Sequence, residues 1–259
     1  MRASQVLILI PARFASTRFP GKPLQKILDK SLIERVYSGC LSKVPISSLV
    51  IEVAVVTDDQ RIESAVKKFG GNVCRVDDPV ETGSERIALA FNRFFKNKSY
   101  DLVINVQGDE PLIQFEDLLK MCTNHLRSDF DIFTLVRKQL GSSEDYNDPN
   151  KVKVALSSFT DGHARAIYFS RAKIPYNRDD VEGRPNYWHS HVGIYSYLPA
   201  SLEKFIKLPK GVCESLEKLE QLRALEHGLT IAAVETENTY IGVDSPGDIL
   251  KVEGVLNVK

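Results

Sequence analysis

A basic loop follows the first apolar segment of the chain. Residues 11–23 read PARFASTRFPGKP and place Arg13, Arg18 and Lys22 among hydroxyl side chains and a glycine. Cations, hydroxyl groups and backbone N–H groups in one short loop are the groups that bind a polyphosphate. The loop matches neither the GxxxxGK[ST] nor the GxGxxG nucleotide-binding pattern. Its composition alone is equally compatible with a solvated basic loop that binds no ligand.

Two carboxylates follow apolar segments at distant positions in the chain. Asp109 lies in the sequence QGDEP after the apolar run 102–106, and Asp244 lies 135 positions later, before Ser245-Pro246. Mg²⁺ takes one or two protein carboxylates and leaves its other positions to phosphate and water, so the carboxylates of the QGDEP segment suit a nucleotide-bound cation. Each residue also has a purely structural interpretation, Asp109 as the cap of a turn and Asp244 at a helix N-terminus. The local sequence favours the helix for Asp244, and only convergence with Asp109 reverses that preference.

The segments around these residues alternate between apolar runs and helical patterns. The runs typical of strands buried on both faces are 6–10, 50–57, 72–76, 102–106 and 132–136. The predicted helices are 31–40, 58–69, 84–95 and 115–126, the first with a capping box formed by Ser31 and Glu34. This alternation predicts a mostly parallel sheet flanked by helices, whose ligands bind beyond the carboxyl ends of the strands. The basic loop and Asp109 are both expected at that edge.

From about residue 150 the pattern becomes that of an antiparallel subdomain. Residues 152–157 and 164–169 flank Thr160-Asp-Gly162 as a predicted hairpin, and 188–197 is a further strand. Helices over about 199–208 and 215–227, a strand over 230–234 and a helix after Pro246 close the chain. We therefore expect a single domain over 1–259. Its core comprises about 1–150 and 228–259, and the smaller subdomain about 151–227.

Composition and charge exclude several classes of protein. The 259 residues are 43% hydrophobic and 26% charged, as in ordinary globular proteins. Thirty-four Lys and Arg balance 34 Asp and Glu, so no whole-chain field attracts nucleic acid or an anionic membrane. The first 43 residues are nevertheless basic, with eight Lys or Arg against Asp29 and Glu34. An acidic ligand is therefore expected to be held locally, and this end of the chain is the candidate anion site.

Neither a targeting segment nor a cysteine framework is recognised. The apolar run 6–10 ends at Pro11 and is too short for a signal peptide or a membrane span. Cys40, Cys74, Cys122 and Cys213 have neither zinc-ligand nor disulfide-framework spacing. The cytoplasm is the expected compartment.

Seven ordered motifs span nearly the whole chain. They are IPARFASTRFPGKPL at 10–24, TGSER at 82–86, NVQGDEP at 105–111, YFSRA at 168–172, HVGIY at 191–195, LEQLR at 219–223 and GVDSP at 242–246. In this order they resemble the motifs of the CMP-Kdo synthetases, the 3-deoxy-manno-octulosonate (Kdo) cytidylyltransferases. The resemblance implies a nucleotide-diphosphosugar-transferase-like, Rossmann-like α/β fold and a homodimer. It also implies an enzyme that transfers CMP from CTP to Kdo with release of pyrophosphate, for lipopolysaccharide biosynthesis, with no nucleic-acid or membrane partner.

The resemblance assigns roles to individual residues. The implied nucleotide-binding residues are Ala12, Arg13, Ser16, Lys22, Thr82, Gly83, Ser84, Arg86 and Gln107. The implied sugar-binding residues are Gln107, Arg171, His191, Tyr195, Glu220 and Gln221, and the 151–227 subdomain would bind the sugar and form the dimer. Catalysis is implied for Lys22, Arg13, Asp109 and Asp244, the two aspartates binding Mg²⁺. In that mechanism the sugar hydroxyl, activated by Mg²⁺, attacks the α-phosphorus of CTP, while Lys22 and Arg13 stabilise the leaving pyrophosphate.

The chemistry of the sugar agrees with these roles. Kdo presents a carboxylate and a polyol, which require a cation or imidazole and amide or carboxylate groups respectively. Taken alone, however, a histidine such as His191 on a strand is more often a packing residue, and Glu220-Gln221 is a solvated helix face.

Departures from the family pattern leave other functions open. Phe14 and Phe19 stand where Tyr and Leu are usual, and TGS stands for the common SGT. Lys173 and Tyr176 replace the frequent Thr and Trp, so the preference between Kdo and an 8-amino variant is open. A CMP-sialic acid synthetase or another sugar nucleotidyltransferase is the alternative enzyme, which the STRFPGK loop disfavours. A nucleotide-binding regulatory or scaffold protein without catalysis is the alternative class, which the intact Lys22, Asp109 and Asp244 disfavour.

Overall fold

A computed structural model describes residues 2–15, 19–42 and 46–257. The chain folds into two compact units, Met1–Leu118 with Thr239–Lys259 and Leu119–Asn238. The chain passes between the units after Leu118 and before Thr239, whereas the sequence predicted subdomain boundaries near 150 and 228. The reason is strand pairing, because the strand that begins at Ile132 pairs with two strands of the second unit.

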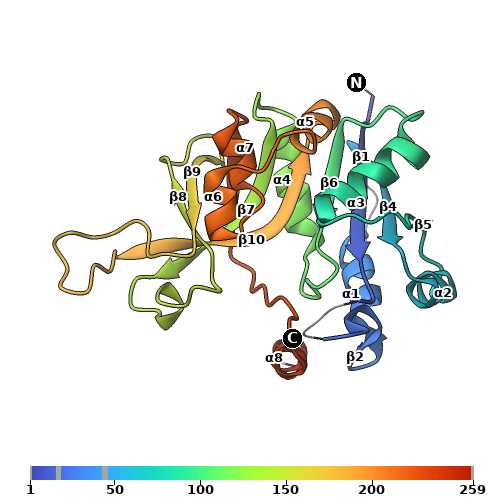
Figure 1. The fold of residues 1–259 in the computed structure, drawn as a ribbon, viewed down its shortest axis with the longest axis horizontal. Helices are drawn as coiled ribbons and strands as arrows, with labels where there is room; N and C mark the ends of the chain where they lie inside the picture. The colour runs from blue at the N-terminus through green and yellow to red at the C-terminus, as the bar shows by residue number, and fades with distance from the viewer. Residues whose placement is uncertain (1, 16–18, 43–45, 258–259) are drawn as a thin grey trace. The chain divides into compact units, whose positions relative to one another are not determined.

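The first unit is built on a parallel sheet. Its strands are β1 (Ser4–Ala12), β4 (Leu49–Thr57), β5 (Val73–Arg75) and β6 (Leu102–Val106). Their order is β5-β4-β1-β6, with every neighbouring pair parallel, and β1 and β4 point the same way in Figure 1. Val6 to Ile10 on β1 are fully buried. The predicted strand, buried on both faces, is confirmed.

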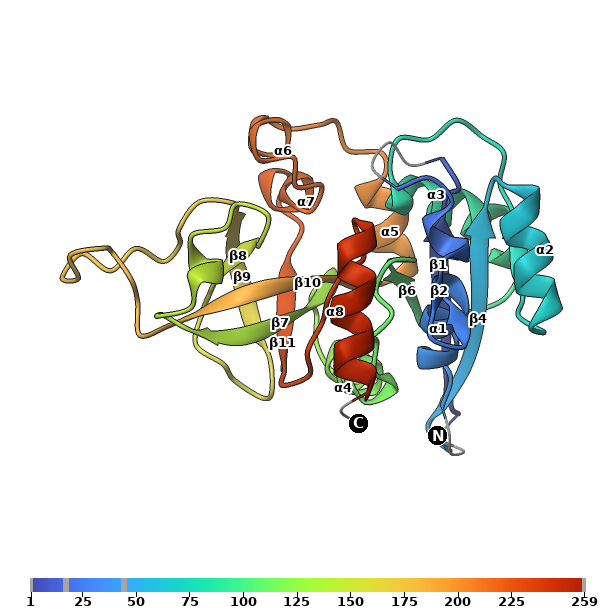
Figure 2. The same cartoon turned by 90° about the horizontal axis from the view of Figure 1, so that it is seen from below.

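Side-chain caps begin the helices that accompany this sheet. The helices are α1 (Leu32–Gly39), α2 (Gln60–Lys68), which flanks β4 in Figure 2, α3 (Gly83–Ala90), continued by a π-helical turn (Phe91–Phe95), and α8 (Pro246–Asn257). Ser31 caps α1 by accepting from the Glu34 N–H, which is one half of the predicted capping box, and Asp59 caps α2. A complete capping box of Thr82 and Glu85 begins α3. The short elements of this unit are η1 (Lys22–Leu24), β2 (Lys26–Ile27) and β3 (Lys30–Ser31).

The second unit is mainly antiparallel, as predicted for the latter part of the chain. Its strands are β7 (Ile132–Leu140), β8 (Lys153–Leu156), β9 (Ala164–Ser170), β10 (Tyr187–Tyr197) and β11 (Ile231–Thr236). They follow the order β10-β7-β11-β9-β8, and β8 also pairs with β10, the long curved strand in Figure 1. Only β7 and β11 are parallel among these pairs. The predicted β8–β9 hairpin is confirmed.

The helices of the second unit correct one prediction. They are α5 (Pro199–Phe205), α6 (Val212–Glu217), α7 (Leu222–Glu226) and the turn η3 (Glu144–Tyr146), while α4 (Phe115–His125) spans the division between units. The single helix expected over 215–227 is wrong, because Lys218 adopts a left-handed conformation with φ of 54° that ends α6. No helix in the described ranges is long and apolar enough to cross a membrane.

Candidate active site

A pocket of about 400 Å³ lies in the first unit beyond the carboxyl ends of β1 and β6. Its lining residues are Pro11, Ala12, Arg13, Ala15, Lys22, Pro23, Gly83, Gln107, Gly108 and Asp109. The basic loop and the QGDEP segment therefore lie together, as the alternation of strands and helices predicted. Ala12, Arg13, Lys22, Gly83, Gln107 and Asp109 are the members of the predicted site that meet here.

Two glycines allow the loops of this pocket to approach each other. A Cβ atom on Gly108 would lie 2.7 Å from the Pro11 carbonyl oxygen, and one on Gly83 would lie 3.2 Å from the Pro11 ring. A larger side chain at Gly108 therefore displaces backbone. The close approach holds Gln107 and Asp109 beside the basic loop.

Lys22 enters the pocket from a tight turn. Gly21 has φ of 70° and donates its N–H to the Phe14 carbonyl at 2.9 Å, and η1 begins at the next residue. The Phe14 ring packs against Gly21, and the Arg61 guanidinium lies 3.2 Å from the ring centroid. Asp59 holds Arg61 through both carboxylate oxygens. Sequence reasoning missed this support, because residues 14 and 61 are joined only by the fold.

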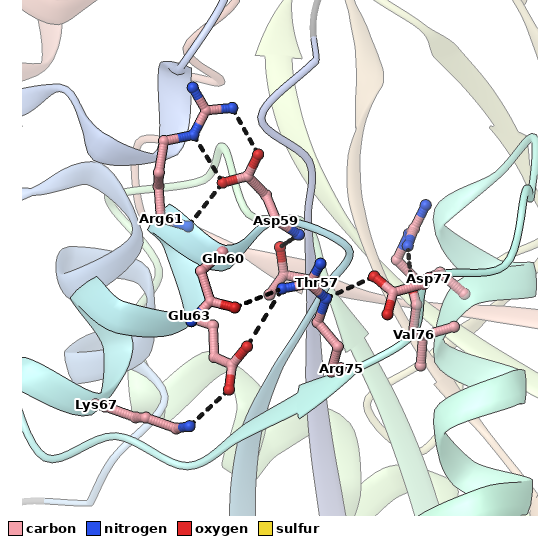
Figure 3. A network of polar contacts seen from close by, with 10 residues as sticks. Thr57, Asp59, Gln60, Arg61, Glu63, Lys67, Arg75, Val76 and Asp77 are labelled. Atoms are coloured by element: carbon pink, nitrogen blue, oxygen red, sulfur yellow. Dashed lines mark hydrogen bonds and ion pairs between the residues drawn. The ribbon is translucent and has the colours of Figure 1, made fainter.

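A polar network fixes the start of α2, which carries Arg61. Figure 3 shows the contacts among Asp59, Arg61, Glu63 and Arg75. Thr57 Oγ1 accepts the Asp59 N–H, so the network is tied to the end of β4. The Phe14 ring thus rests on a guanidinium that is itself held in place.

The two predicted carboxylates converge on Lys22. The Lys22 Nζ lies 2.7 Å from Asp109 Oδ2 and 3.6 Å from Asp244 Oδ1. The Val243 N–H donates to the Asp109 carbonyl at 2.9 Å, which aligns the GVDSP segment with the QGDEP segment. Two carboxylates 135 positions apart thus lie beside one ammonium, and their expected convergence on Mg²⁺ stays a prediction.

Asp248, rather than Asp244, caps helix α8. Its Oδ2 accepts from the Asp244 N–H at 3.2 Å, the Ser245 N–H at 2.9 Å and the Ser245 hydroxyl at 2.8 Å. Burial raises the pKa of Asp248, but hydrogen bonds from Lys251 and Ser245 outweigh it and bring the pKa below its usual range. These hydrogen bonds give the acidic position of a capping box at this helix to Asp248. The Ser245-x-x-Asp248 pattern is the capping-box signal that identifies the right residue.

The donor set suits a hard cation shared with phosphate. In the described part of the chain no group of three or more His, Cys, Asp or Glu side chains is arranged to hold a metal. Asp109 and Asp244 supply two carboxylates that already surround one positive charge. Mg²⁺ is commonly held by one or two carboxylates together with substrate phosphates, so the two aspartates fit it.

Arg13 has the electrostatic signature of an anion site. Its Nη2 is buried and has no hydrogen-bond partner among the described residues. Burial lowers the pKa of the neighbouring Arg86, and the Arg13 charge acts in the same direction against the attraction of Asp58. A buried donor without a partner beside a second guanidinium favours an anionic ligand.

Apart from Gly83, the residues of the TGSER motif use their side chains for contacts within the fold. Thr82 belongs to the cap of α3, and the buried Ser84 accepts from Asn105 Nδ2 at 3.5 Å. Arg86 binds Asp58 at 2.8 Å and the Val76 carbonyl at 2.6 Å. Only Gly83 of the motif lines the pocket. Ser16, predicted to bind the triphosphate, lies outside the described residues.

In the second unit a β-bulge brings two predicted sugar-site residues together. Val192 pairs in register with Leu135 and Tyr195 with Thr134, so β10 carries two extra residues opposite adjacent positions of β7. The rings of His191 and Tyr195 consequently lie 5.3 Å apart between centroids. The bulge turns a four-residue separation into direct contact.

His191 is a neutral hydrogen-bonding group. Burial lowers its pKa to about 3. Its Nε2 lies 3.0 Å from Thr134 Oγ1, and that hydroxyl donates to the Ile194 carbonyl at 2.8 Å. We therefore assign the proton to Nε2, which leaves Nδ1 as an acceptor. Arg171 and His191 are the two residues expected to meet the sugar carboxylate. Because the His191 imidazole is neutral, only Arg171 of the two is a cation.

Arg171 is anchored by backbone carbonyls and by Glu217. Its Nε donates to the Glu217 carbonyl at 2.7 Å and its Nη1 to the Pro149 carbonyl at 2.9 Å. Glu217 accepts the Arg171 N–H, and the buried Lys153 ammonium donates to the Arg171 carbonyl. Sequence reasoning missed Lys153 and Glu217, whose types and positions carry no pattern. They fix the segment that follows β9.

Glu220 and Gln221 lie in the turn between α6 and α7, not on a continuous helix. Gln221 is the N-cap residue of α7 and is buried. Burial raises the pKa of Tyr195 well above its usual value, with Tyr197 and Glu220 acting in the same direction. Arg223 and Glu214 form a buried bidentate ion pair that ties the two helices. His191, Tyr195 and Glu220 are thus associated. Among the described residues, no hydrogen bond or ion pair joins Arg171 to these three side chains.

Comparison with known proteins decides the family. The cytidylyltransferase family profile matches residues 7–231. The chain belongs to the CMP-Kdo synthetase family. It is 40% identical to the 3-deoxy-manno-octulosonate cytidylyltransferase of Porphyromonas gingivalis, over 96% of this chain and 95% of that protein. It is 41% identical to the 8-amino-3,8-dideoxy-manno-octulosonate cytidylyltransferase of Shewanella pealeana, over 98% and 99% of the two chains.

A solved structure of the family has the same fold. The structure of CMP:2-keto-3-deoxy-manno-octonic acid synthetase complexed with CTP superposes with a TM-score of 0.85 at 33% identity. The match covers 98% of this chain and 99% of that one. The chain is therefore a cytidylyltransferase, a nucleotidyltransferase enzyme, with the expected nucleotide-diphosphosugar-transferase-like α/β fold.

Proposed function

We propose that this member of the CMP-Kdo synthetase family transfers CMP from CTP to Kdo and releases pyrophosphate. The observation that carries the proposal is the convergence of Asp109 and Asp244 on Lys22 beside the pocket. A lysine and two carboxylates at the carboxyl edge of a parallel sheet are the groups that a metal–triphosphate substrate requires. The relatives with Kdo in their names supply the sugar.

The residues of the first unit act on the nucleotide. Arg13 donates its unpaired N–H groups to the triphosphate, and Lys22 neutralises the charge that develops on the leaving pyrophosphate. The Kdo anomeric hydroxyl attacks the α-phosphorus, and the bond to pyrophosphate breaks. Asp109 and Asp244 would hold a Mg²⁺ ion, which would supply charge neutralisation and lower the pKa of the attacking hydroxyl. Gln107 lines the same pocket and offers an amide to either substrate.

The residues of the second unit bind the sugar acid. Arg171 pairs with the carboxylate, and His191 accepts from a sugar hydroxyl through Nδ1. Tyr195, Glu220 and Gln221 supply further groups for the polyol. Lys173 is an exposed cation two residues after Arg171. Its positive charge repels the ammonium group of an 8-amino substrate. We therefore place Kdo before its 8-amino variant as the acceptor.

The cellular setting is part of the proposal. A homodimer, a cytoplasmic location and a role in lipopolysaccharide biosynthesis accompany the proposed reaction, because CTP is a cytoplasmic metabolite and activated Kdo is a building block for that polymer.

Product analysis tests the proposed reaction. The protein is incubated with CTP, Mg²⁺ and either Kdo or 8-amino-Kdo, and the products are followed by ³¹P NMR. The expected result is a CMP–sugar phosphodiester and pyrophosphate, faster with Kdo, and abolished by excess EDTA. Absence of any CMP–sugar with either acceptor contradicts the proposal.

A further inference from the structure

We propose that Lys22 decides which form of ligand the Asp109–Asp244 site accepts: the carboxylates bind a divalent cation together with a nucleotide and not the free cation. This inference rests on the proposed function and goes beyond it. The observation is the position of the Lys22 ammonium, 2.7 Å from Asp109 Oδ2 and 3.6 Å from Asp244 Oδ1.

The ammonium already satisfies the oxygen that a metal ion needs. Lys22 Nζ donates to Asp109 Oδ2 at 2.7 Å, which is the length of a charge-assisted hydrogen bond. A bound Mg²⁺ lies about 2.0 to 2.1 Å from its oxygen ligands, so both cations compete for the same oxygen. Like charges at such separations repel strongly, and Lys22 is largely shielded from water, with 15% of its side chain exposed. Free metal must therefore displace the lysine.

A triphosphate gives the displaced lysine a new partner. Lys22 lines the same pocket as Arg13, whose Nη2 is buried without a partner among the described residues. Phosphate oxygens in that pocket attract both cations. Once the ammonium turns to the phosphates, Asp109 and Asp244 are left with two negative charges and without the lysine as counter-ion. The divalent cation carried by the nucleotide then replaces it.

The consequence is a coupling between the two ligands. Nucleotide raises the affinity for metal, and metal raises the affinity for nucleotide by the same factor. Direct metal–phosphate contacts contribute to this factor in any variant. Release of Lys22 adds a contribution that only a lysine at this position provides.

Titration of the ligand-free protein with Mn²⁺, followed by electron paramagnetic resonance of the free ion, tests the inference. Lys22→Met removes the charge while keeping most of the side-chain volume. Its Mn²⁺ dissociation constant is expected to be at least about tenfold lower than that of the parent, because the carboxylates lose their resident cation. The enhancement of Mn²⁺ binding by CTP is expected to be smaller in the variant than in the parent.

Matched variants make the result specific. Lys26→Met removes the positive charge of an exposed side chain on β2 and is expected to leave the Mn²⁺ affinity within about twofold of the parent. Asp109→Asn combined with Lys22→Met is expected to abolish the gained affinity. Lys22→Gln repeats the measurement if the methionine variant melts early.

Two results overturn the inference: equal Mn²⁺ affinity of the ligand-free parent and the Lys22 variants, or gained affinity that survives Asp109→Asn. Neither concerns the reaction itself, because formation of CMP–sugar by the parent tests the proposed function separately. A parent that makes CMP–Kdo and binds free Mn²⁺ as tightly as the Lys22 variants keeps its function and loses this role of Lys22.

Discussion

Asp109 and Asp244 are residues whose removal separates chemistry from folding. Their side chains are 33% and 56% exposed, and ion pairs at such positions contribute at most about 1 kcal/mol. We expect Asp109→Asn and Asp244→Asn each to lower kcat by at least about a hundredfold, since stabilisation by a metal amounts to several kcal/mol. Each variant should melt within a few degrees of the parent. Full Mg²⁺-dependent turnover in either folded variant would refute the two-carboxylate site.

Arg171 is the cation that we propose as the partner of the sugar carboxylate. We expect Arg171→Ala to raise KM for Kdo by well over tenfold, because loss of a paired charge costs on the order of 2 to 5 kcal/mol. KM for CTP should change little. Steady-state kinetics with each substrate varied in turn measure the split. Normal use of Kdo by this variant would mean that the sugar binds elsewhere.

His191 should bind the sugar without changing its charge. With its pKa lowered to about 3 by burial, the imidazole is neutral throughout the pH range of an ordinary assay. We expect His191→Ala to raise KM for Kdo, and the parent KM for Kdo to be flat between about pH 6 and 8. An inflection near the ordinary histidine pKa that disappears in the variant would show that His191 is charged when it acts.

At the level of elements, Asp248 holds the start of α8 and the backbone of Asp244. Its loss should cost about 0.5 to 2 kcal/mol, the usual range for a helix cap, and lower Tm by a few degrees. We expect Asp248→Ala to lower Tm more than Asp244→Asn, and Asp244→Asn to lower kcat more than Asp248→Ala. Thermal unfolding and initial rates on the two purified variants measure both orders. The reverse order in Tm would return the capping role to Asp244.

The elements show where sequence patterns suffice and where they fail. The strands at 4–12, 49–57 and 102–106 follow from short apolar runs typical of a buried parallel sheet. The break between α6 and α7 could not be predicted, because its left-handed residue is Lys218 and not a glycine. The support of Phe14 by Arg61 was equally inaccessible, since only tertiary packing brings the α2 residue to the loop.

The site residues also divide into those that sequence patterns predict and those whose environment depends on tertiary packing. Local signals placed the basic loop and Asp109 at one sheet edge, and the family motifs supplied Asp244 and the sugar residues. The neutral state of His191 depends on its burial beside β7, and the anchoring of Arg171 depends on Lys153 and Glu217. Such environments arise from contacts between distant segments, which no spacing along the chain reveals.

At the level of the whole molecule, two buried histidines make stability depend on pH. Burial lowers the pKa of His125 to about 4 and that of His191 to about 3. The unfolded chain binds protons at both below about pH 6.5, and the folded chain does not until pH falls through the lowered values. Stability is therefore complete above about pH 6.5 and lost as pH falls toward 4. The loss approaches about 2 kcal/mol per histidine at about pH 5.

Urea unfolding near neutral pH and near pH 5 measures this dependence. We expect the parent to be less stable at the lower pH, and His125→Gln to lose less stability between the two values than the parent does. Equal stability of the parent at both values would mean that the imidazoles are protonated in the folded protein.

The central claim is that this chain joins CTP to Kdo at the site built by Lys22, Asp109 and Asp244. Initial rates of pyrophosphate release with each of the four ribonucleoside triphosphates, with and without Kdo and with Mg²⁺ present, test it most directly. The account predicts rapid release only when CTP and Kdo are both present, with UTP as the sole substitute and a weak one. Equal or higher kcat/KM with ATP or GTP, or release that is independent of Kdo, would contradict it.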